Sequence, residues 1–514
     1  MANKKNFGAV VIFAGGLFSK IIGFAREIIF ANWFGVGDVA TAFRIAQSGF
    51  LLPTHSLIGE TLSSGLLPLY KKYSDRNRIF PIVLRYLAIV YAVALSFVIS
   101  ISLYLFAEFW VKHIAPGVSA GPLNLAADFL KIMSLAVPFY VVGGLFSYIE
   151  AAHGKYSGIS LRPVLMNVGA IAGAACAVYF NVDMYVALGF SVGHVFIFLW
   201  GFFRIQGIVK RDDHSLRFKL LWFPIAKQFF KTIAPLMFVP FVMQLNMLIE
   251  RIVSSRYGAA VIPSVDYARV VSDTFIQLVS VPLGVVTMSM FSGKDSVELK
   301  TYACNVFVVL LAAFIPLSLW SAQFASEIVN LIFVRGAFDS VAANLTSTLL
   351  FWFSLGMSFG GAGYYLMKVL NTQLKNRIVM IVVLAGCIVN VAVNLYLGPV
   401  FGFAVVGVGY LFNSLIVCFL CIYFLGYFKQ IFFYLLLIAC IGGVQASLHW
   451  TMKIYLEPTV AFIFSFALLF FTYVAMSIFV HPLNNIVTLI FDKILKKVCL
   501  LYTSDAADEG LGVD

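Results

Sequence analysis

The chain has 514 residues, of which 61% are hydrophobic and only 11% are charged, and its mean hydropathy is +0.96. Soluble domains are close to half apolar and a quarter charged, so this composition excludes an ordinary soluble protein. A net charge of +12 would suggest a nucleic-acid partner in a soluble protein, but in a membrane protein it indicates basic cytoplasmic loops. We therefore expect an integral membrane protein with no nucleic-acid partner.

About fourteen apolar segments follow one another along the chain. Because they lack the period-two alternation of a β-barrel, we expect them to cross the bilayer as α-helices, which makes the fold class an all-α polytopic membrane protein. The expected spans are residues 7–31, 40–67, 81–108, 124–152, 159–180, 184–206, 224–254, 265–291, 301–322, 344–370, 376–397, 401–426, 429–450 and 458–480. Residues 484–500 have lysines among apolar residues, which is typical of an interfacial helix. We expect residues 501–514, which are acidic and polar, to form a disordered or artefactual tail.

Positive charge alternates between successive loops. The loop after the second span is basic, with Lys71, Lys72, Arg76 and Arg78, and so are the other loops that follow even-numbered spans. Loops after odd-numbered spans hold few cations. Since basic loops lie in the cytoplasm, the pattern predicts an even number of spans with both termini cytoplasmic.

An internal repeat relates the first two spans to the seventh and eighth. The same order of features occurs twice: Arg26-Glu27, Phe34-Gly35 and Arg44, then Glu250-Arg251, Tyr257-Gly258 and Arg269. Chance similarity between apolar helices is the alternative. We interpret the repeat as two pseudo-symmetric six-helix halves, residues 1–206 and 207–426, followed by two extra transmembrane helices and the interfacial helix at 427–500.

Charged residues lie inside several spans, where each costs about 2.5–3.5 kcal/mol at the bilayer centre. Such residues normally face a cavity or a partner, so we expect them to bind substrate. The candidates come from the first, second, seventh and eighth spans: Lys20, Arg26, Glu27, Arg44, Glu60, Glu250, Arg251, Asp266, Arg269 and Asp273. We expect one cavity between the halves, whose cations suit an anionic group such as phosphate. For the pairs Arg26-Glu27 and Glu250-Arg251, the alternative is that they lie near span ends and extend to the membrane interface.

Asn390 and Asn394 lie four residues apart in the eleventh span and face the same way. Their carbonyl oxygens could hold a monovalent cation, although hydrogen bonding between helices is the commoner use of such residues. The sequence has no nucleophile elbow, phosphate loop or zinc-ligand spacing. We therefore expect no enzyme activity and no cofactor beyond coupling to a cation.

Four short segments are distinctive. They are Phe18-Ser-Lys20-Ile-Ile-Gly23-Phe-Ala-Arg26-Glu27, Pro282-Leu-Gly284-Val-Val, Ile332-Phe-Val-Arg335-Gly336-Ala-Phe338-Asp339 and Asn390-Val-Ala-Val-Asn394-Leu. Together they resemble the MviN/MurJ lipid II flippases of the multidrug/oligosaccharidyl-lipid/polysaccharide exporter superfamily. The resemblance covers residues 5–480, and its most specific piece begins at Arg335.

The resemblance implies a function for the chain. Members export an undecaprenyl-diphosphate-linked saccharide, lipid II, from the inner to the outer leaflet of the bacterial cytoplasmic membrane by alternating access. The family's cavity residues correspond to Lys20, Arg26 and Glu60. Its acidic residue before Ala42 is Thr41 here, and two of its cavity arginines are absent, so Arg44 and Arg269 are candidates to replace them. We expect a monomer whose partners are this lipid-linked substrate and the membrane lipids.

Three alternatives remain open at this point. The substrate could be another lipid-linked oligosaccharide, such as an O-antigen, capsule or exopolysaccharide unit. Drug/cation antiport on the same fold would favour an acidic, aromatic cavity, whereas this one is rich in cations. A membrane polymerase or ligase would need catalytic residues on a large external loop, and no loop here is long enough to form one.

Overall fold

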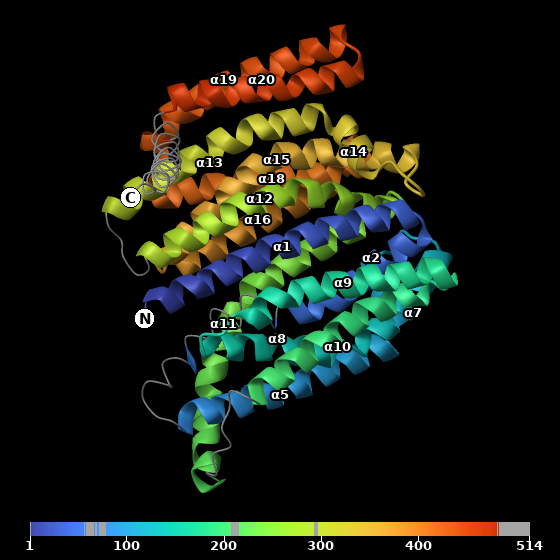
Figure 1. Ribbon diagram of the computed structural model, residues 1–514, viewed down its shortest axis with the longest axis vertical. Helices are drawn as coiled ribbons and strands as arrows, with labels where there is room; N and C mark the ends of the chain where they lie inside the picture. The colour runs from blue at the N-terminus through green and yellow to red at the C-terminus, as the bar shows by residue number, and fades with distance from the viewer. Residues whose placement is uncertain are drawn as a thin grey trace, which may run out of the picture. The chain divides into compact units, whose positions relative to one another are not determined.

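The computed structural model describes residues 2–55, 57, 66, 69–70, 79–206, 215–291, 297–480 and 482. Within this part of the chain every regular element is a helix (Figure 1). In chain order they are α1 (Ala2–Phe34), α2 (Asp38–His55), α5 (Ile79–Leu105), α6 (Ala107–Ile114), α7 (Ala120–Ser134), α8 (Val137–Ala152), α9 (Ser157–Phe180), α10 (Met184–Gln206), α11 (Ser215–Arg256), α12 (Val261–Phe291), α13 (Val297–Gln323), α14 (Ala325–Phe333), α15 (Ser340–Thr372), α16 (Asn376–Tyr396), α17 (Gly398–Phe401), the 3₁₀ helix η2 (Gly402–Ala404), α18 (Val405–Leu425), α19 (Phe428–Tyr455) and α20 (Pro458–Phe479). The predicted interfacial helix at 484–500 and the tail at 501–514 lie outside the described residues.

The described helices confirm a multi-pass, all-helical membrane protein. Eleven are long and apolar enough to cross a membrane, and there are up to twelve spans if α7 and α8, bent by 48° at the break between them, form one. The helices α1 and α2, which correspond to the predicted spans 7–31 and 40–67, are not in this set. The count of fourteen therefore stays a prediction.

The chain divides into two compact units, and unit 1 contains Met1–Leu278, Ile328–Phe353 and Met380–Asn413. Within unit 1, α10 packs against α8 and α9, α1 packs against α9, and α2 packs against α7. The packed apolar side chains of this unit include Phe43 and Phe50 of α2, both fully buried. This packing holds α1, α2 and α9 in fixed positions relative to one another.

Glycines allow α9 and α10 to approach closely. A Cβ atom on Gly169 would lie 2.6 Å from the carbonyl oxygen of Gly189, and one on Gly193 would lie 2.9 Å from the carbonyl oxygen of Leu165. Small residues permit such backbone contact between membrane helices. The contact fixes α9, which contributes two residues to the site described below.

Unit 2 contains Val279–Glu327, Ser354–Val379 and Ser414–Asp514. Within unit 2, α13 packs against α19 and α20, and those two helices pack against each other. Neutral groups form hydrogen bonds across this interface. Gln445 Nε2 donates to the carbonyl oxygen of Pro316 at 3.0 Å, and Trp320 Nε1 donates to Ser465 Oγ at 2.7 Å.

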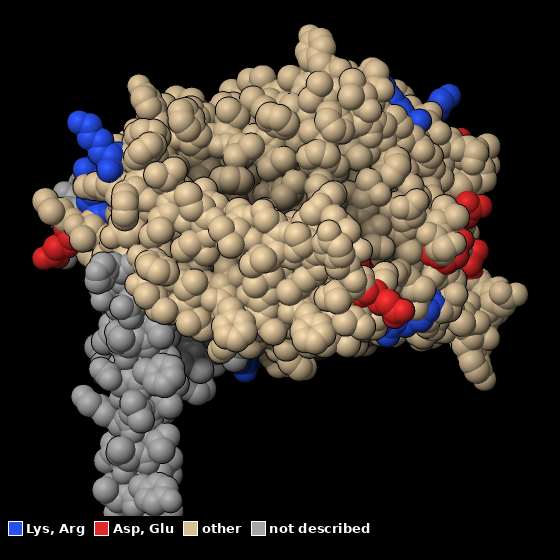
Figure 2. All heavy atoms as spheres, turned by 90° about the horizontal axis from the view of Figure 1, so that it is seen from above, with Lys and Arg blue, Asp and Glu red and all other residues tan. Residues whose placement is uncertain are grey.

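One face of the molecule is largely uncharged across its central part. Figure 2 shows the Lys, Arg, Asp and Glu side chains of this face gathered toward the two ends of the view, with uncharged side chains between them. Charged groups avoid the hydrocarbon core of a bilayer and gather at its interfaces. The distribution is therefore the one expected of a surface that faces lipid.

Candidate functional site

A cavity of about 430 Å³ lies inside unit 1. Its described lining comes from α1, α2, α9, α11 and α12, and four of these helices are the spans from which the sequence predicted a charged cavity. Eight predicted candidates line it: Lys20, Arg26, Glu27, Arg44, Arg251, Asp266, Arg269 and Asp273. Five cations and three carboxylates give this described lining a net charge of +2. The volume is within the range of about 300–1,000 Å³ that is usual for small-molecule sites.

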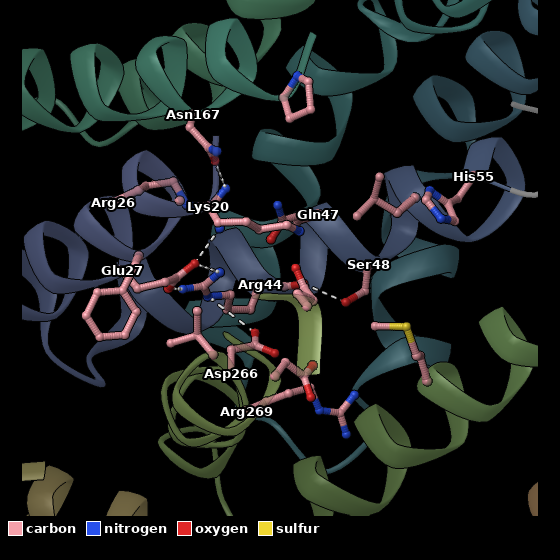
Figure 3. Close-up of a pocket in the computed structure, with 18 of the residues that line it drawn as sticks. Lys20, Arg26, Glu27, Arg44, Gln47, Ser48, His55, Asn167, Asp266 and Arg269 are labelled. Atoms are coloured by element: carbon pink, nitrogen blue, oxygen red, sulfur yellow. Dashed lines mark hydrogen bonds and ion pairs between the residues drawn. The ribbon is translucent and has the colours of Figure 1, made fainter. Parts of the chain in front are cut away.

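Glu27 on α1 is the centre of a first group of ion pairs (Figure 3). Arg26 Nη2, from the same helix, and Arg44 Nη2, from α2, each donate to one oxygen of its carboxylate, and Arg44 Nη1 lies 3.3 Å from Glu27 Oε1. The side chain of Glu27 is only 4% exposed, whereas that of Arg26 is 18% exposed. A buried carboxylate needs compensation of this kind, because burying a lone charge is very costly.

Asp266 on α12 connects that group to α11. Arg251 Nη2 donates to both oxygens of Asp266 at 2.6 Å, and Arg44 Nε lies 3.3 Å from Asp266 Oδ2. Arg251 also donates to the carbonyl oxygen of Ile262 at 2.9 Å and to Ser48 Oγ at 3.1 Å. A continuous chain of ion pairs therefore joins four helices, α1, α2, α12 and α11.

Glu250 and Arg269 form a second ion pair. Arg269 Nη2, on α12, donates to Glu250 Oε2, on α11. The arginine lines the cavity and its side chain is 18% exposed, whereas Glu250 is 5% exposed and does not belong to the lining. Glu250 is thus the counter-charge of Arg269, and Arg269 is the member of this pair that lines the cavity.

Asn390 and Asn394 of α16 are not part of the cavity lining, and Asn390 contacts Glu250. Asn390 Nδ2 donates to Glu250 Oε1 at 2.8 Å and to Asn246 Oδ1 at 2.9 Å, while Asn394 Nδ2 donates to Asn390 Oδ1 at 2.7 Å. Within this group, Asn394 Oδ1 is buried without a hydrogen-bond partner. The arrangement is that of hydrogen bonding between helices, and the cation site stays a prediction.

The charged residues predicted on α12 and α1 lie together in the cavity. Asp266, Arg269 and Asp273 all line it, as their spacing of three and four residues predicts for one stripe. Lys20 and Arg26 of α1 both line it as well. The predicted Glu60 lies outside the described residues.

The charged pairs are buried inside the protein. Glu27, Glu250 and Arg251 are at most 8% exposed and pair with residues of other helices, so the alternative of side chains that extend to the membrane interface does not describe them.

Asn167 on α9 is a contact that sequence reasoning missed. Its Oδ1 accepts a hydrogen bond from Arg26 Nη1 at 2.9 Å, and Figure 3 shows it above that arginine. It is a neutral partner that orients Arg26 without a second charge. The signal available in the sequence was a single amide side chain within an apolar span, a pattern that more often reflects packing between helices.

Comparison with known proteins places the chain in a family. Residues 30–481 match the model of the family described as lipid II flippase MurJ. The chain is 28% identical to a Synechocystis protein named "Probable lipid II flippase MurJ", over 69% of this chain and 68% of that one. It is 25% identical to the "Lipid II flippase MurJ" of Burkholderia cenocepacia, over 78% of this chain and 80% of that one.

A solved structure shares the fold. It is titled "Lipid II flippase MurJ, inward closed conformation", and it superposes with a TM-score of 0.80 at 20% sequence identity, covering 92% of this chain and all of that one. The family match extends over most of the chain, including the cavity arginines Arg44 and Arg269. The chain therefore belongs to the lipid II flippase MurJ family.

Proposed function

We propose that this protein moves lipid II, an undecaprenyl-diphosphate-linked saccharide, from the inner to the outer leaflet of the bacterial cytoplasmic membrane. The observation that carries the proposal is the cavity of net positive charge inside the membrane helices of a chain of this family. The diphosphate is anionic, and arginine binds phosphate oxygens through paired hydrogen bonds. An acidic cavity, which a cationic drug would favour, is not what the described lining residues form.

The cavity cations that face the diphosphate are Lys20, Arg26 and Arg269. Lys20 is exposed, and the side chains of Arg26 and Arg269 are each 18% exposed, so their donors can reach a bound group. Moving a lipid between leaflets makes and breaks no covalent bond. The protein therefore acts as a transporter and not as an enzyme, and these residues bind without catalysing a reaction.

Contacts toward the C-terminal end of α1 support an alternating-access mechanism. Ala337 N donates to the carbonyl oxygen of Asn32 at 2.8 Å, and Tyr267 Oη donates to that of Gly35 at 2.9 Å. Thr41 Oγ1, at the start of α2, donates to the carbonyl oxygen of Ala259 at 3.1 Å. The contacts of Tyr267 and Thr41 involve helices that line the cavity, α12 and α2, and the contact of Ala337 joins α1 to the segment between α14 and α15. With both termini in the cytoplasm, as we propose, they close its outer side and must separate for substrate release.

The proposal includes fourteen spans in two six-helix halves, with α1 and α2 as the two spans beyond the twelve apolar ones. The ion pairs support this arrangement. Glu27 and Arg44 pair between α1 and α2, and the residues at the matching repeat positions, Glu250 and Arg269, pair between α11 and α12. Equivalent residues in equivalent contacts are what an internal repeat produces.

Coupling to a monovalent cation is also part of the proposal. Glu250 and the buried Asn394 Oδ1 are the oxygens available near α16. Flipping by the purified protein, which we propose acts as a monomer in the lipid bilayer, should become faster when a sodium gradient is imposed across the vesicle membrane. Equal rates with and without the gradient would remove sodium from the mechanism and leave the membrane potential as the driving force.

The direct cellular test is complementation of bacteria depleted of their own lipid II flippase. The wild-type chain should restore growth, whereas Arg26→Ala should fail although the protein accumulates in the membrane. Failure of the wild-type chain at normal membrane abundance would contradict lipid II as substrate and favour another lipid-linked oligosaccharide. Growth supported equally by Arg26→Ala would contradict the role of the cavity.

A further inference from the structure

Two arginines at matching positions of the repeat, Arg44 and Arg269, have different surroundings. The side chain of Arg44 is 3% exposed and pairs with two carboxylates, those of Glu27 and Asp266. Its guanidinium carbon also lies 5.6 Å from the ring centroid of Tyr267. Arg269 is 18% exposed, and its one ion pair with a described residue is with Glu250. Arg44 is therefore enclosed by counter-charges and rings, while Arg269 remains accessible from the cavity.

Two arginines contact the single negative charge of Glu27, and one of them is enough to compensate it. Arg44 contacts both of its carboxylate oxygens, and Arg26 contacts one of them. If Arg26 turned toward an anion in the cavity, Glu27 would still be compensated by Arg44. The other partner of Arg26 is the neutral Asn167, so within the described part of the chain no second carboxylate pairs with Arg26.

We propose that Arg44 is a positioning residue, which neutralises Glu27 and thereby leaves Arg26 available to bind the substrate diphosphate. This inference rests on the proposed function and changes the expectation that Arg44 itself replaces a missing cavity cation. Without Arg44, Arg26 would be the one remaining charged partner of a buried carboxylate, and an anion would have to compete with that carboxylate for it.

The two carboxylates that contact Arg44 depend on it differently. Asp266 keeps a bidentate contact with Arg251 at 2.6 Å when Arg44 is removed, so its charge stays compensated. Among the residues that the structure describes, Arg26 is the one other arginine paired with Glu27. The difference supplies a matched control. Neutralising Glu27 should reduce the effect of removing Arg44 on ligand binding, whereas neutralising Asp266 should leave that effect unchanged.

The experiment is calorimetric titration of the full-length, detergent-purified chain with inorganic pyrophosphate. We expect Arg44→Gln to raise the Kd at least about tenfold in the native background. In the Glu27→Gln background, the same substitution should change the Kd less than about threefold. In the Asp266→Asn background, Arg44→Gln should again raise the Kd about tenfold or more. An undiminished effect of Arg44→Gln in the Glu27→Gln background would identify Arg44 as a direct ligand and overturn the inference.

Two further comparisons separate positioning from loss of fold and from direct binding. A misfolded fraction lowers the stoichiometry of the titration, whereas loss of positioning raises the Kd at unchanged stoichiometry. Arg44→Lys, which keeps the charge, should weaken binding less than Arg44→Gln does, and equal weakening would overturn the inference. Arg269→Gln should weaken pyrophosphate binding equally in the native and in the Glu250→Gln background, because Arg269 faces the ligand itself. A smaller effect in the Glu250→Gln background would mean that the two arginines do not differ in role.

The same proteins in lipid vesicles test the proposed function separately. If the wild type binds pyrophosphate but does not move lipid II, the proposed function fails, and the role of Arg44 is still decided by the titrations. If the wild type moves lipid II and the titrations show no relief by Glu27→Gln, the inference about Arg44 alone fails.

Discussion

The charged cavity of unit 1 and the helix interface of α13, α19 and α20 in unit 2 both place polar side chains inside apolar helices. In the cavity they are full charges, arranged in ion pairs whose outer members, such as Arg26, are partly exposed. In the interface they are mostly neutral groups that form hydrogen bonds between helices, such as Trp320 with Ser465. Among the described residues, Lys453 at the end of α19 pairs with Glu327 of the neighbouring helix α14.

The difference shows how a membrane protein uses polarity for two purposes. Hydrogen bonds between neutral groups hold helices together at modest cost, with typical contributions of about 0.6 kcal/mol. Charges within a span are far more expensive, so their retention indicates binding. Substitutions in the two regions should therefore separate activity from stability.

The largest expected effect is on transport. Arg269→Ala should lower the rate of lipid II flipping about 100-fold, because it removes a cavity-facing cation that binds the diphosphate. The measurement is flipping in proteoliposomes that contain equal amounts of folded protein. The matched control is Lys453→Ala from the interface, which should stay within about twofold of the wild type. A comparable loss in both variants would mean that the cavity has no special role.

The next effect is on stability. Asp266→Ala leaves Arg251 and Arg44 each short of a counter-charge, and should lower the free energy of unfolding by about 3 kcal/mol. The measurement is denaturant unfolding in detergent micelles. A loss below about 1 kcal/mol would show that this chain of ion pairs does not join the four helices energetically.

A smaller loss is expected in the interface. Ser465→Ala removes the acceptor of the Trp320 hydrogen bond and should cost about 1 kcal/mol of unfolding free energy. Flipping should be unchanged once the amount of folded protein is matched. Reduced transport at matched folding would show that the interface takes part in the transport cycle, and the contrast between the two regions would not hold.

The smallest effect tests a neutral residue of the cavity. Asn167→Ala removes the second partner of Arg26 but leaves its charge and its contact with Glu27. Flipping should fall about threefold, which corresponds to about 0.6 kcal/mol. A loss as large as that of Arg269→Ala would mean that Asn167 contacts the substrate directly.

Much of this architecture could be predicted from the sequence, because hydropathy and spacing act along one helix. Runs of apolar residues located the spans, and the spacing of Asp266, Arg269 and Asp273 placed them on one stripe that lines the cavity. The same method predicted spans at residues 7–31 and 40–67, which correspond to α1 and α2, and these two stay a prediction.

What could not be predicted depends on partners from other helices. Arg44 was expected to bind substrate, yet its contacts with Glu27 and Asp266 enclose it. Glu250 was expected in the cavity, and it lies behind Arg269. Asn167 gave no signal because its role comes from its proximity to Arg26, 141 residues away in the chain. Periodicity assigns a residue to a face of its own helix and carries no information about the helix opposite.

The most direct test of the central claim is the movement of fluorescent lipid II between the leaflets of proteoliposomes, followed by the access of a membrane-impermeant quencher. The account predicts that the wild-type protein exposes the labelled lipid far faster than protein-free vesicles do, and that Arg26→Ala at equal incorporation is close to the protein-free rate. Wild-type vesicles that behave like protein-free ones, or an Arg26→Ala protein as fast as the wild type, would contradict it.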